Sequence, residues 1–132
     1  MAEPLEDLKR LVFEGRLTSV VEWLKHKIEL QLLNSEEELW VENHPELLPL
    51  KNNLVKEADG TYRPDSALTL VRTRLILSRA IRSIDSKKIT LEEVVELLKN
   101  CTSAQIYTLG VSYFQLVSRE QEALQQSILK NS

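Results

Sequence analysis

The side chains best suited to catalysis are few in this chain, and no catalytic motif surrounds them. The 132 residues include two histidines, His26 and His44, and one cysteine, Cys101. Nucleophilic and acid–base catalysis need several such groups close together, for example a nucleophile beside a base. The metal- and phosphate-binding motifs HExxH, CxxC, GxGxxG and GxxxxGK(S/T) do not occur in the sequence. We therefore expect a protein that is not an enzyme, with no catalytic residue, cofactor, metal or small-molecule substrate.

Basic side chains are the second group suited to binding a ligand, and they gather in the later part of the chain. Residues 1–60 hold seven basic and thirteen acidic residues (net −6), whereas residues 61–132 hold ten and seven (net +3). The whole chain has a formal net charge of −3, which excludes a polyphosphate-binding protein by bulk charge. One explanation of the basic segment is an ordinary solvated helix face. The other is contact with an anion or a nucleic acid through five side chains: Arg72, Arg79, Arg82, Lys87 and Lys88.

The composition favours helices over strands. The chain contains three glycines, four prolines and 24 leucines, and only 5% of its residues are aromatic. A sheet protein of this size needs more β-branched and aromatic residues and more turn glycines. We therefore expect an all-α fold, a single-domain helical bundle of about five or six helices over residues 1–132. One long loop near residues 50–64 interrupts it, and a minor division of the domain at this loop is the alternative.

Apolar spacing and capping signals predict where the helices begin and end. Three capping boxes predict helix starts, at Ser35/Glu38, Thr90/Glu93 and Thr102/Gln105. The expected helices cover residues 5–14, 18–33, 35–41, 65–84, 90–98 and 103–128. Within the long loop, the pair Asp59-Gly60 is able to close a small hairpin between Val55 and Tyr62, and an irregular loop is the alternative.

The segment 18–33 carries more apolar surface than one face of a helix. At 100° per residue, Val20, Leu24 and Ile28 share one face, whereas Trp23, Leu30 and Leu33 lie almost opposite. Either this second face is buried inside the chain, or it contacts another chain. Tryptophan is frequent at interface hot spots, so these three residues are candidates for a protein interface.

A second apolar stripe lies near the C-terminus. Leu124 and Ile128 are four residues apart on one helix face, with Leu129 beside them, beyond the densest apolar stretch of the last helix. A frayed tail is one explanation of this stripe, and a partner-binding end is the other. We include all three residues in the expected protein interface.

These surfaces predict a protein–protein interaction or regulatory adaptor module that binds another protein or, as a homodimer, a second copy of itself. The alternative is a nucleic-acid-binding regulator or nucleoprotein component that uses the basic segment 63–88 and the helix 103–118. The two helices around residues 100–102 have helix-turn-helix spacing, but the second contains no Lys or Arg before Arg119.

Cysteine usage and hydropathy indicate a compartment. A single cysteine excludes an intrachain disulfide and no signal peptide is evident, so we expect a reducing, cytoplasmic location. No apolar run approaches the roughly 18 residues of a membrane span, so no membrane partner is expected.

Overall fold

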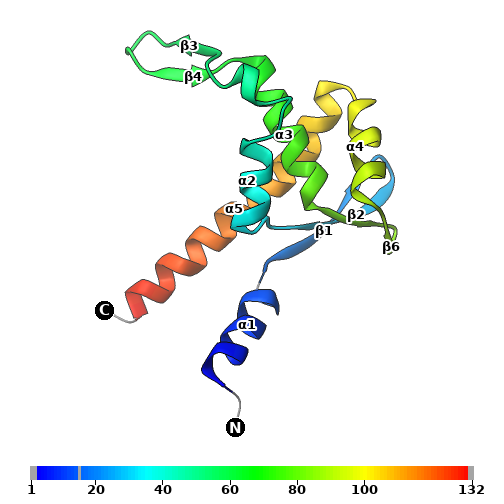
Figure 1. Ribbon diagram of the computed structural model, residues 1–132, viewed down its shortest axis with the longest axis vertical. Coiled ribbons are helices and arrows are strands. Elements are labelled where there is room, and N and C mark those ends of the chain that lie inside the picture. Colours follow the sequence, from blue (N-terminus) through cyan, green and yellow to red (C-terminus); the bar gives the residue numbers. More distant parts are fainter. Residues whose placement is uncertain (1–2, 15, 131–132) are drawn as a thin grey trace.

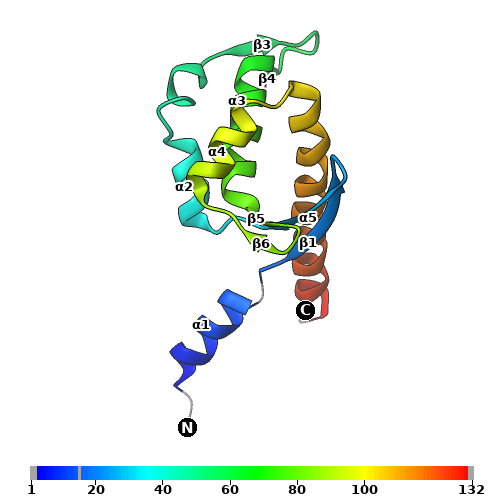
Figure 2. The same cartoon turned by 90° about the vertical axis from the view of Figure 1, so that its right-hand side faces the viewer.

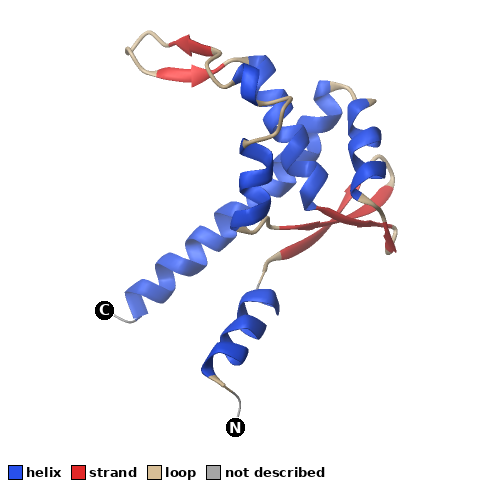
Figure 3. Ribbon diagram, viewed as in Figure 1, coloured by secondary structure: helices blue, strands red, loops and turns tan. Residues whose placement is uncertain are grey.

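A four-stranded antiparallel sheet lies against one end of the helices, where the sequence predicted none (Figures 1 and 3). The computed structural model describes residues 3–14 and 16–130. The strand order of this sheet is β1-β2-β5-β6, and a second sheet pairs β3 with β4. The prediction of an all-α helical bundle is therefore wrong, because the fold is mixed α/β.

Five α-helices, one 3₁₀ turn and six strands make up the described residues. The helices are α1 (Pro4–Glu14), α2 (Ser35–Glu42), α3 (Ser66–Ala80), α4 (Leu91–Lys99) and α5 (Ser103–Lys130), and the 3₁₀ turn is Leu48–Leu50. The strands are β1 (Thr18–Trp23), β2 (His26–Gln31), β3 (Leu54–Lys56), β4 (Tyr62–Pro64), β5 (Ile81–Ile84) and β6 (Lys87–Lys88).

The segment 18–33 forms a hairpin of two strands, and the single helix predicted there is wrong. β1 and β2 pair antiparallel across a two-residue turn at Leu24 and Lys25, whose φ angles of 50° and 70° are left-handed. Side chains of a strand alternate between its two faces, and Trp23 and Leu30 both lie on the buried face. The residues of the supposed helix are thus divided between two strands: Ile28 of the first apolar face points inward with Trp23 and Leu30, whereas Val20 and Leu24 are exposed.

The helix predicted over residues 65–84 ends early, at Ala80, and the chain continues directly into β5. A second left-handed pair, Asp85 and Ser86 with φ angles of 51° and 68°, then turns the chain into β6. β5 also pairs antiparallel with β2, with a register irregularity in the middle. The Asp85 carboxylate accepts a hydrogen bond from the Lys27 N–H at 2.8 Å, so the two hairpins are joined at their turns.

Of the three predicted capping boxes, two form where expected and one is shifted by a residue, whereas the helix start predicted at residue 18 is wrong because β1 lies there. α4 and α5 begin at their predicted boxes, with Thr90 and Thr102 as the capping residues. α2 is capped by Asn34 rather than Ser35, and the Asn34 side chain accepts a hydrogen bond from the Glu37 N–H at 2.8 Å. In return, the Glu37 carboxylate accepts a hydrogen bond from the Asn34 N–H at 3.0 Å. This bond holds the Glu37 side chain toward the body of the chain.

The core surrounds α3, which packs against α2, α4 and α5 (Figure 2). Leu68, Leu75 and Leu77 of α3 are almost completely buried. The inward face of the sheet and the first half of α5 complete the core. α3 therefore is the central helix expected from its apolar pattern, although it is shorter than predicted.

Three parts of the described chain project from this body: the β3–β4 hairpin, α1 and the second half of α5 (Figures 1 and 2). The hairpin turns at Asp59 and Gly60, and Gly60 has a φ of 89°, so the long loop forms the small hairpin and not an irregular connection. Among the described residues, no helix combines the length and apolar character needed to cross a membrane.

Candidate functional site

Three of the residues expected at a protein interface lie in the core of the chain. Trp23, Leu30 and Leu33 are buried, and the Trp23 indole Nε1–H donates a hydrogen bond to the Gln105 carbonyl oxygen at 3.1 Å. The sequence left two explanations for this apolar face, burial inside the chain or contact with another chain. The structure shows the first. These three residues contribute to folding and are not available to a partner in the folded chain.

The other predicted interface residues lie on the projecting end of α5. The side chains of Leu124 and Leu129 are 58% and 72% exposed. The side chain of Ile128 is outside the described residues. This end of α5 extends beyond the body of the molecule (Figure 1).

A further exposed apolar face, which the prediction did not include in the interface, lies on α1. Its residues Leu5, Leu8 and Val12, here called the α1 stripe, are between 57% and 65% exposed. They follow one another at intervals of three and four residues, the spacing of a helix-pairing seam. The α1 stripe, together with Asn34 and Arg16, lines a cavity of about 430 Å³ between α1 and the start of α2. The spacing was visible in the sequence, but nothing there indicated that α1 would stay outside the core.

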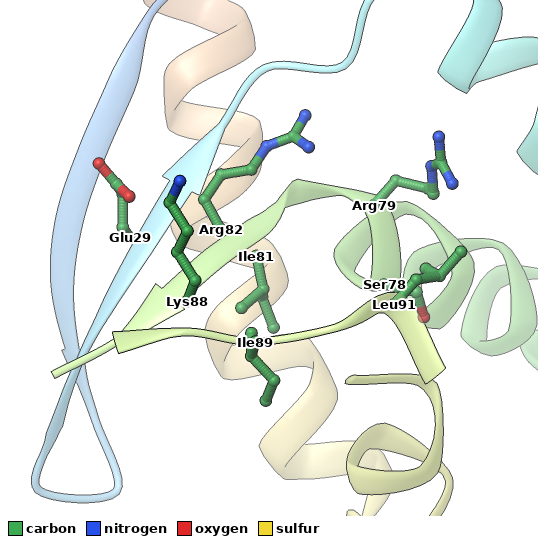
Figure 4. Close-up of a pocket in the computed structure, with 8 residues that line it drawn as sticks. All are labelled: Glu29, Ser78, Arg79, Ile81, Arg82, Lys88, Ile89 and Leu91. Atoms are coloured by element: carbon green, nitrogen blue, oxygen red, sulfur yellow. The ribbon is translucent and has the colours of Figure 1, made fainter. Parts of the chain in front are cut away.

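The five predicted anion-binding cations separate into two groups. Arg72 donates hydrogen bonds to both carboxylate oxygens of Glu42 at 3.0 and 3.1 Å. Lys87 lines a neighbouring cavity, which it shares with Lys88 but not with Arg79 or Arg82. Arg79, Arg82 and Lys88 line one cavity of about 360 Å³ (Figure 4), here called the basic cavity. The remaining lining residues come from β2, α3, β5, the connection after β6 and the first position of α4: Glu29, Ser78, Ile81, Ile89 and Leu91.

Behind the basic cavity, one buried carboxylate is surrounded by three arginines, here called the Glu37 cluster. Arg16 donates to Glu37 at 2.5 Å, Arg82 donates to both of its oxygens at 2.9 and 3.2 Å, and the Nε of Arg79 lies 3.8 Å away. Burial opposes ionisation of Glu37, but the Asn34 N–H and the Arg82 and Arg16 guanidiniums outweigh it and hold the pKa of Glu37 below its ordinary value. Glu37 is therefore an anion at neutral pH.

Two nitrogen atoms of the Glu37 cluster have no hydrogen-bond partner among the described residues. The Nε atoms of Arg79 and Arg82 are buried and have no hydrogen-bond partner among the described residues. The Arg79 guanidinium also stacks over the Trp40 ring, with 5.1 Å between its central carbon and the ring centroid. Lys88 has no ion pair within 4 Å in the part of the chain that the structure describes. Sequence reasoning named these cations but did not find Glu37 or Arg16, which are distant in the sequence.

The histidines and the cysteine do not converge on one site. His26 Nδ1 lies 2.5 Å from the Asp85 carboxylate, at the joined hairpin turns. His44 Nδ1 accepts a hydrogen bond from the Glu46 N–H, and burial raises the pKa of Cys101, which is unfavourable for a reactive thiol. Within residues 3–14 and 16–130, no group of three or more potential metal ligands was found.

α4 and α5 follow one another across the short connection 100–102, and polar side chains at the start of α5 are already hydrogen-bonded. The Gln105 side chain caps the start of α5 by accepting the Thr102 N–H at 2.8 Å, and the Thr108 hydroxyl donates to the Ala104 carbonyl at 2.8 Å. The sequence of α5 contains no Lys or Arg before Arg119, so the first half of this helix supplies no cation for a phosphate.

No protein-family model, curated protein or solved structure matches this chain. The chemistry of its exposed and charged surfaces is therefore the basis for the proposals that follow.

Proposed function

We propose that this chain is a protein–protein interaction module that acts through the apolar faces of its projecting helices. The observation that carries this proposal is the α1 stripe, three large apolar side chains that are more than half exposed on a helix outside the body. An isolated helix of about 11 residues is marginal in water, and most helices of this length are stabilised by packing of their apolar face. A partner that covers the stripe supplies this packing.

A second copy of the chain is the partner that the spacing of the stripe favours. Leu5, Leu8 and Val12 repeat at the intervals with which two amphipathic helices pair, and a two-fold dimer needs one self-complementary face. Burying these side chains from two copies contributes on the order of 10 kcal/mol, against association costs of similar size. We therefore expect a reversible dimer at micromolar to millimolar concentration, with the exposed end of α5 as a further contact.

Sedimentation equilibrium over this concentration range tests the proposal. The variant Leu5→Gln/Leu8→Gln removes two residues of the stripe but retains a residue type that favours helices. Arg10→Gln is the matched control, because it introduces the same side chain on the opposite face of α1. We expect the parent and the control to dimerise, and the double variant to sediment as a monomer.

Two outcomes separate the possible partners. A parent that stays monomeric throughout the range excludes self-association and leaves a different protein as the only partner for the stripe. A double variant that dimerises as strongly as the parent contradicts the role of α1. Circular dichroism of all three proteins shows whether the substitutions have left the fold intact.

A further inference from the structure

We propose that the basic cavity binds a phosphate monoester group. The cavity is formed by residues on α3, β5, β6 and β2, and three of its lining side chains are cationic: Arg79, Arg82 and Lys88. In Figure 4, Ile81 and Ile89 lie between the Lys88 and Arg79 side chains. This proposal does not depend on self-association through the α1 stripe, none of whose residues lines the basic cavity.

The local charge favours an anion with two negative charges. Four cations, Arg16, Arg79, Arg82 and Lys88, lie in or directly behind the cavity, and they are opposed by the two carboxylates of Glu37 and Glu29. The excess is two positive charges. A phosphate monoester at neutral pH carries up to about two negative charges, whereas a carboxylate carries one and leaves a cation uncompensated.

Unused hydrogen-bond donors are the second, independent observation. Buried donors in native proteins almost always have a partner, so a buried N–H without one calls for a ligand or an ordered water. The Nε atoms of both Arg79 and Arg82 are in this condition among the described residues. Both hydrogen bonds from Arg82 to Glu37 come from its Nη2 atom, which anchors this guanidinium, and its Nε–H is unpaired but buried, so an acceptor reaches it only when the side chain shifts. Arg79 donates no hydrogen bond among the described residues, so its guanidinium retains the two parallel N–H bonds with which such groups pair with phosphate oxygens.

The carboxylate of Glu29, which also lines the cavity, is hydrogen-bonded within the sheet. Glu29 accepts a hydrogen bond from the Ser83 hydroxyl at 3.2 Å and, within the described part of the chain, forms no ion pair within 4 Å with Lys88. Lys88 therefore has no carboxylate partner within 4 Å in the described residues, and the charge of Glu29 is the one already included in the balance above. The apolar lining residues Ile81, Ile89 and Leu91 offer a surface for the carbon part of an ester.

The shape of the basic surface distinguishes a phosphate monoester from a nucleic acid. A nucleic-acid backbone needs a row of cations along its path. The flanking candidates do not extend the cavity into such a row, because Arg72 is bound to Glu42 and the neighbouring cavity that Lys87 shares with Lys88 also carries the carboxylates of Asp85 and Glu93. Three cations around one cavity instead fit one terminal phosphate.

Isothermal titration calorimetry with inorganic phosphate and with O-phosphoserine tests the proposal, at an ionic strength held constant with sodium chloride. We expect saturable one-to-one binding with a dissociation constant below about 10 mM, the weak range of a single small anion. Sodium acetate is expected to bind at least tenfold more weakly. Equal binding of acetate, or no saturable binding of either phosphate compound, overturns the proposal.

Two neighbouring lysines provide a matched pair of variants. Lys88→Gln is expected to weaken phosphate binding about tenfold or more, and Lys87→Gln less than about twofold, since only Lys88 lines the basic cavity. Both lysines are exposed, so neither change should affect folding. Arg79→Gln is a further variant, and we expect it to abolish binding. Equal losses in the two lysine variants contradict the assignment of the site.

An oligodeoxythymidine without terminal phosphates distinguishes the two possible sources of phosphate. It contains only phosphodiesters, each with one negative charge, and we expect it not to compete with O-phosphoserine. If it instead binds more tightly than O-phosphoserine and loses affinity in both Lys87→Gln and Lys88→Gln, the surface is a nucleic-acid contact and the monoester proposal is wrong.

Discussion

Replacing Glu37 by glutamine tests the electrostatic organisation of the fold. The Glu37 side chain is only 8% exposed and accepts hydrogen bonds from Arg16, Arg82 and the Asn34 N–H. Glutamine retains the size of the side chain but removes the carboxylate that the three arginines share. Breaking a buried ion pair by removing one partner usually costs about 3–5 kcal/mol. The arginines are partly exposed and water screens them in part, so we expect a loss of about 3 kcal/mol.

The same substitution changes how stability depends on pH. The pKa of Glu37 in the folded chain lies below its ordinary value of 4.5, so its charge stabilises the fold fully above about pH 4.5. This contribution is lost as the pH falls through the lower folded pKa, because the carboxylate then takes up a proton. The parent should therefore lose stability in this acid range, and Glu37→Gln should lack this part of the loss.

Urea unfolding followed by circular dichroism at pH 7 and pH 3 measures both effects. Glu38→Gln is the control, because it is the same change at the next residue of α2, where the side chain is exposed. The control should stay within about 0.5 kcal/mol of the parent. A Glu37→Gln variant that loses less than about 1 kcal/mol at pH 7, or no more than the control, would refute the role of the Glu37 cluster.

Three further substitutions test the core, each by chemical denaturation. Leu77→Ala is expected to lose about 2–5 kcal/mol because Leu77 is fully buried in α3, and a loss below about 0.5 kcal/mol contradicts the central position of this helix. Trp23→Phe removes the hydrogen bond to the Gln105 carbonyl and should lose about 1–3 kcal/mol; no loss would mean that water replaces this bond. Gly110→Ala places a Cβ 2.9 Å from the Thr73 methyl group and should lose about 1–3 kcal/mol. In a Thr73→Ser background, which lacks this methyl group, the same change should instead stabilise the helix by up to about 1 kcal/mol, and the reverse order refutes the steric explanation.

The helix starts were predictable because their determinants are local. A capping box joins residues only three positions apart, and the boxes that begin at Thr90 and Thr102 both form. The one-residue shift at α2 arose because Asn34 and Ser35 are both good cap residues and Glu37 and Glu38 are both able to complete a box. The sequence does not distinguish these two registers.

The strands were missed because their turns lack the usual residues. Leu24 and Lys25 adopt left-handed φ angles that Asn and Gly adopt more readily, so no turn signal divides the segment 18–33. A strand signal was nevertheless present in β2, where polar Lys27 and Glu29 alternate with apolar Ile28 and Leu30. The low content of aromatic and turn residues outweighed this short alternation in the prediction.

The candidate sites depend on contacts that the sequence does not contain. Arg82 was predicted on a helix with Arg79, but the helix ends between them, and both approach Glu37 from a distant part of the sequence. By contrast, the spacing of Leu5 and Leu8 was visible in the sequence. That α1 remains outside the core depends on the packing of the whole chain.

Cysteine cross-linking of α1 between copies tests the central proposal most directly. In a Cys101→Ser background, Leu8→Cys places a thiol at the middle of the α1 stripe, and Arg10→Cys places one on the opposite face. The substituted position 8 lies at the centre of the stripe, so it approaches its own copy in either a parallel or an antiparallel pair. We predict that the Leu8→Cys variant oxidises to a covalent dimer much faster than the Arg10→Cys variant at equal concentration. Equal rates for the two variants, or no covalent dimer from either, would contradict dimerisation through this face.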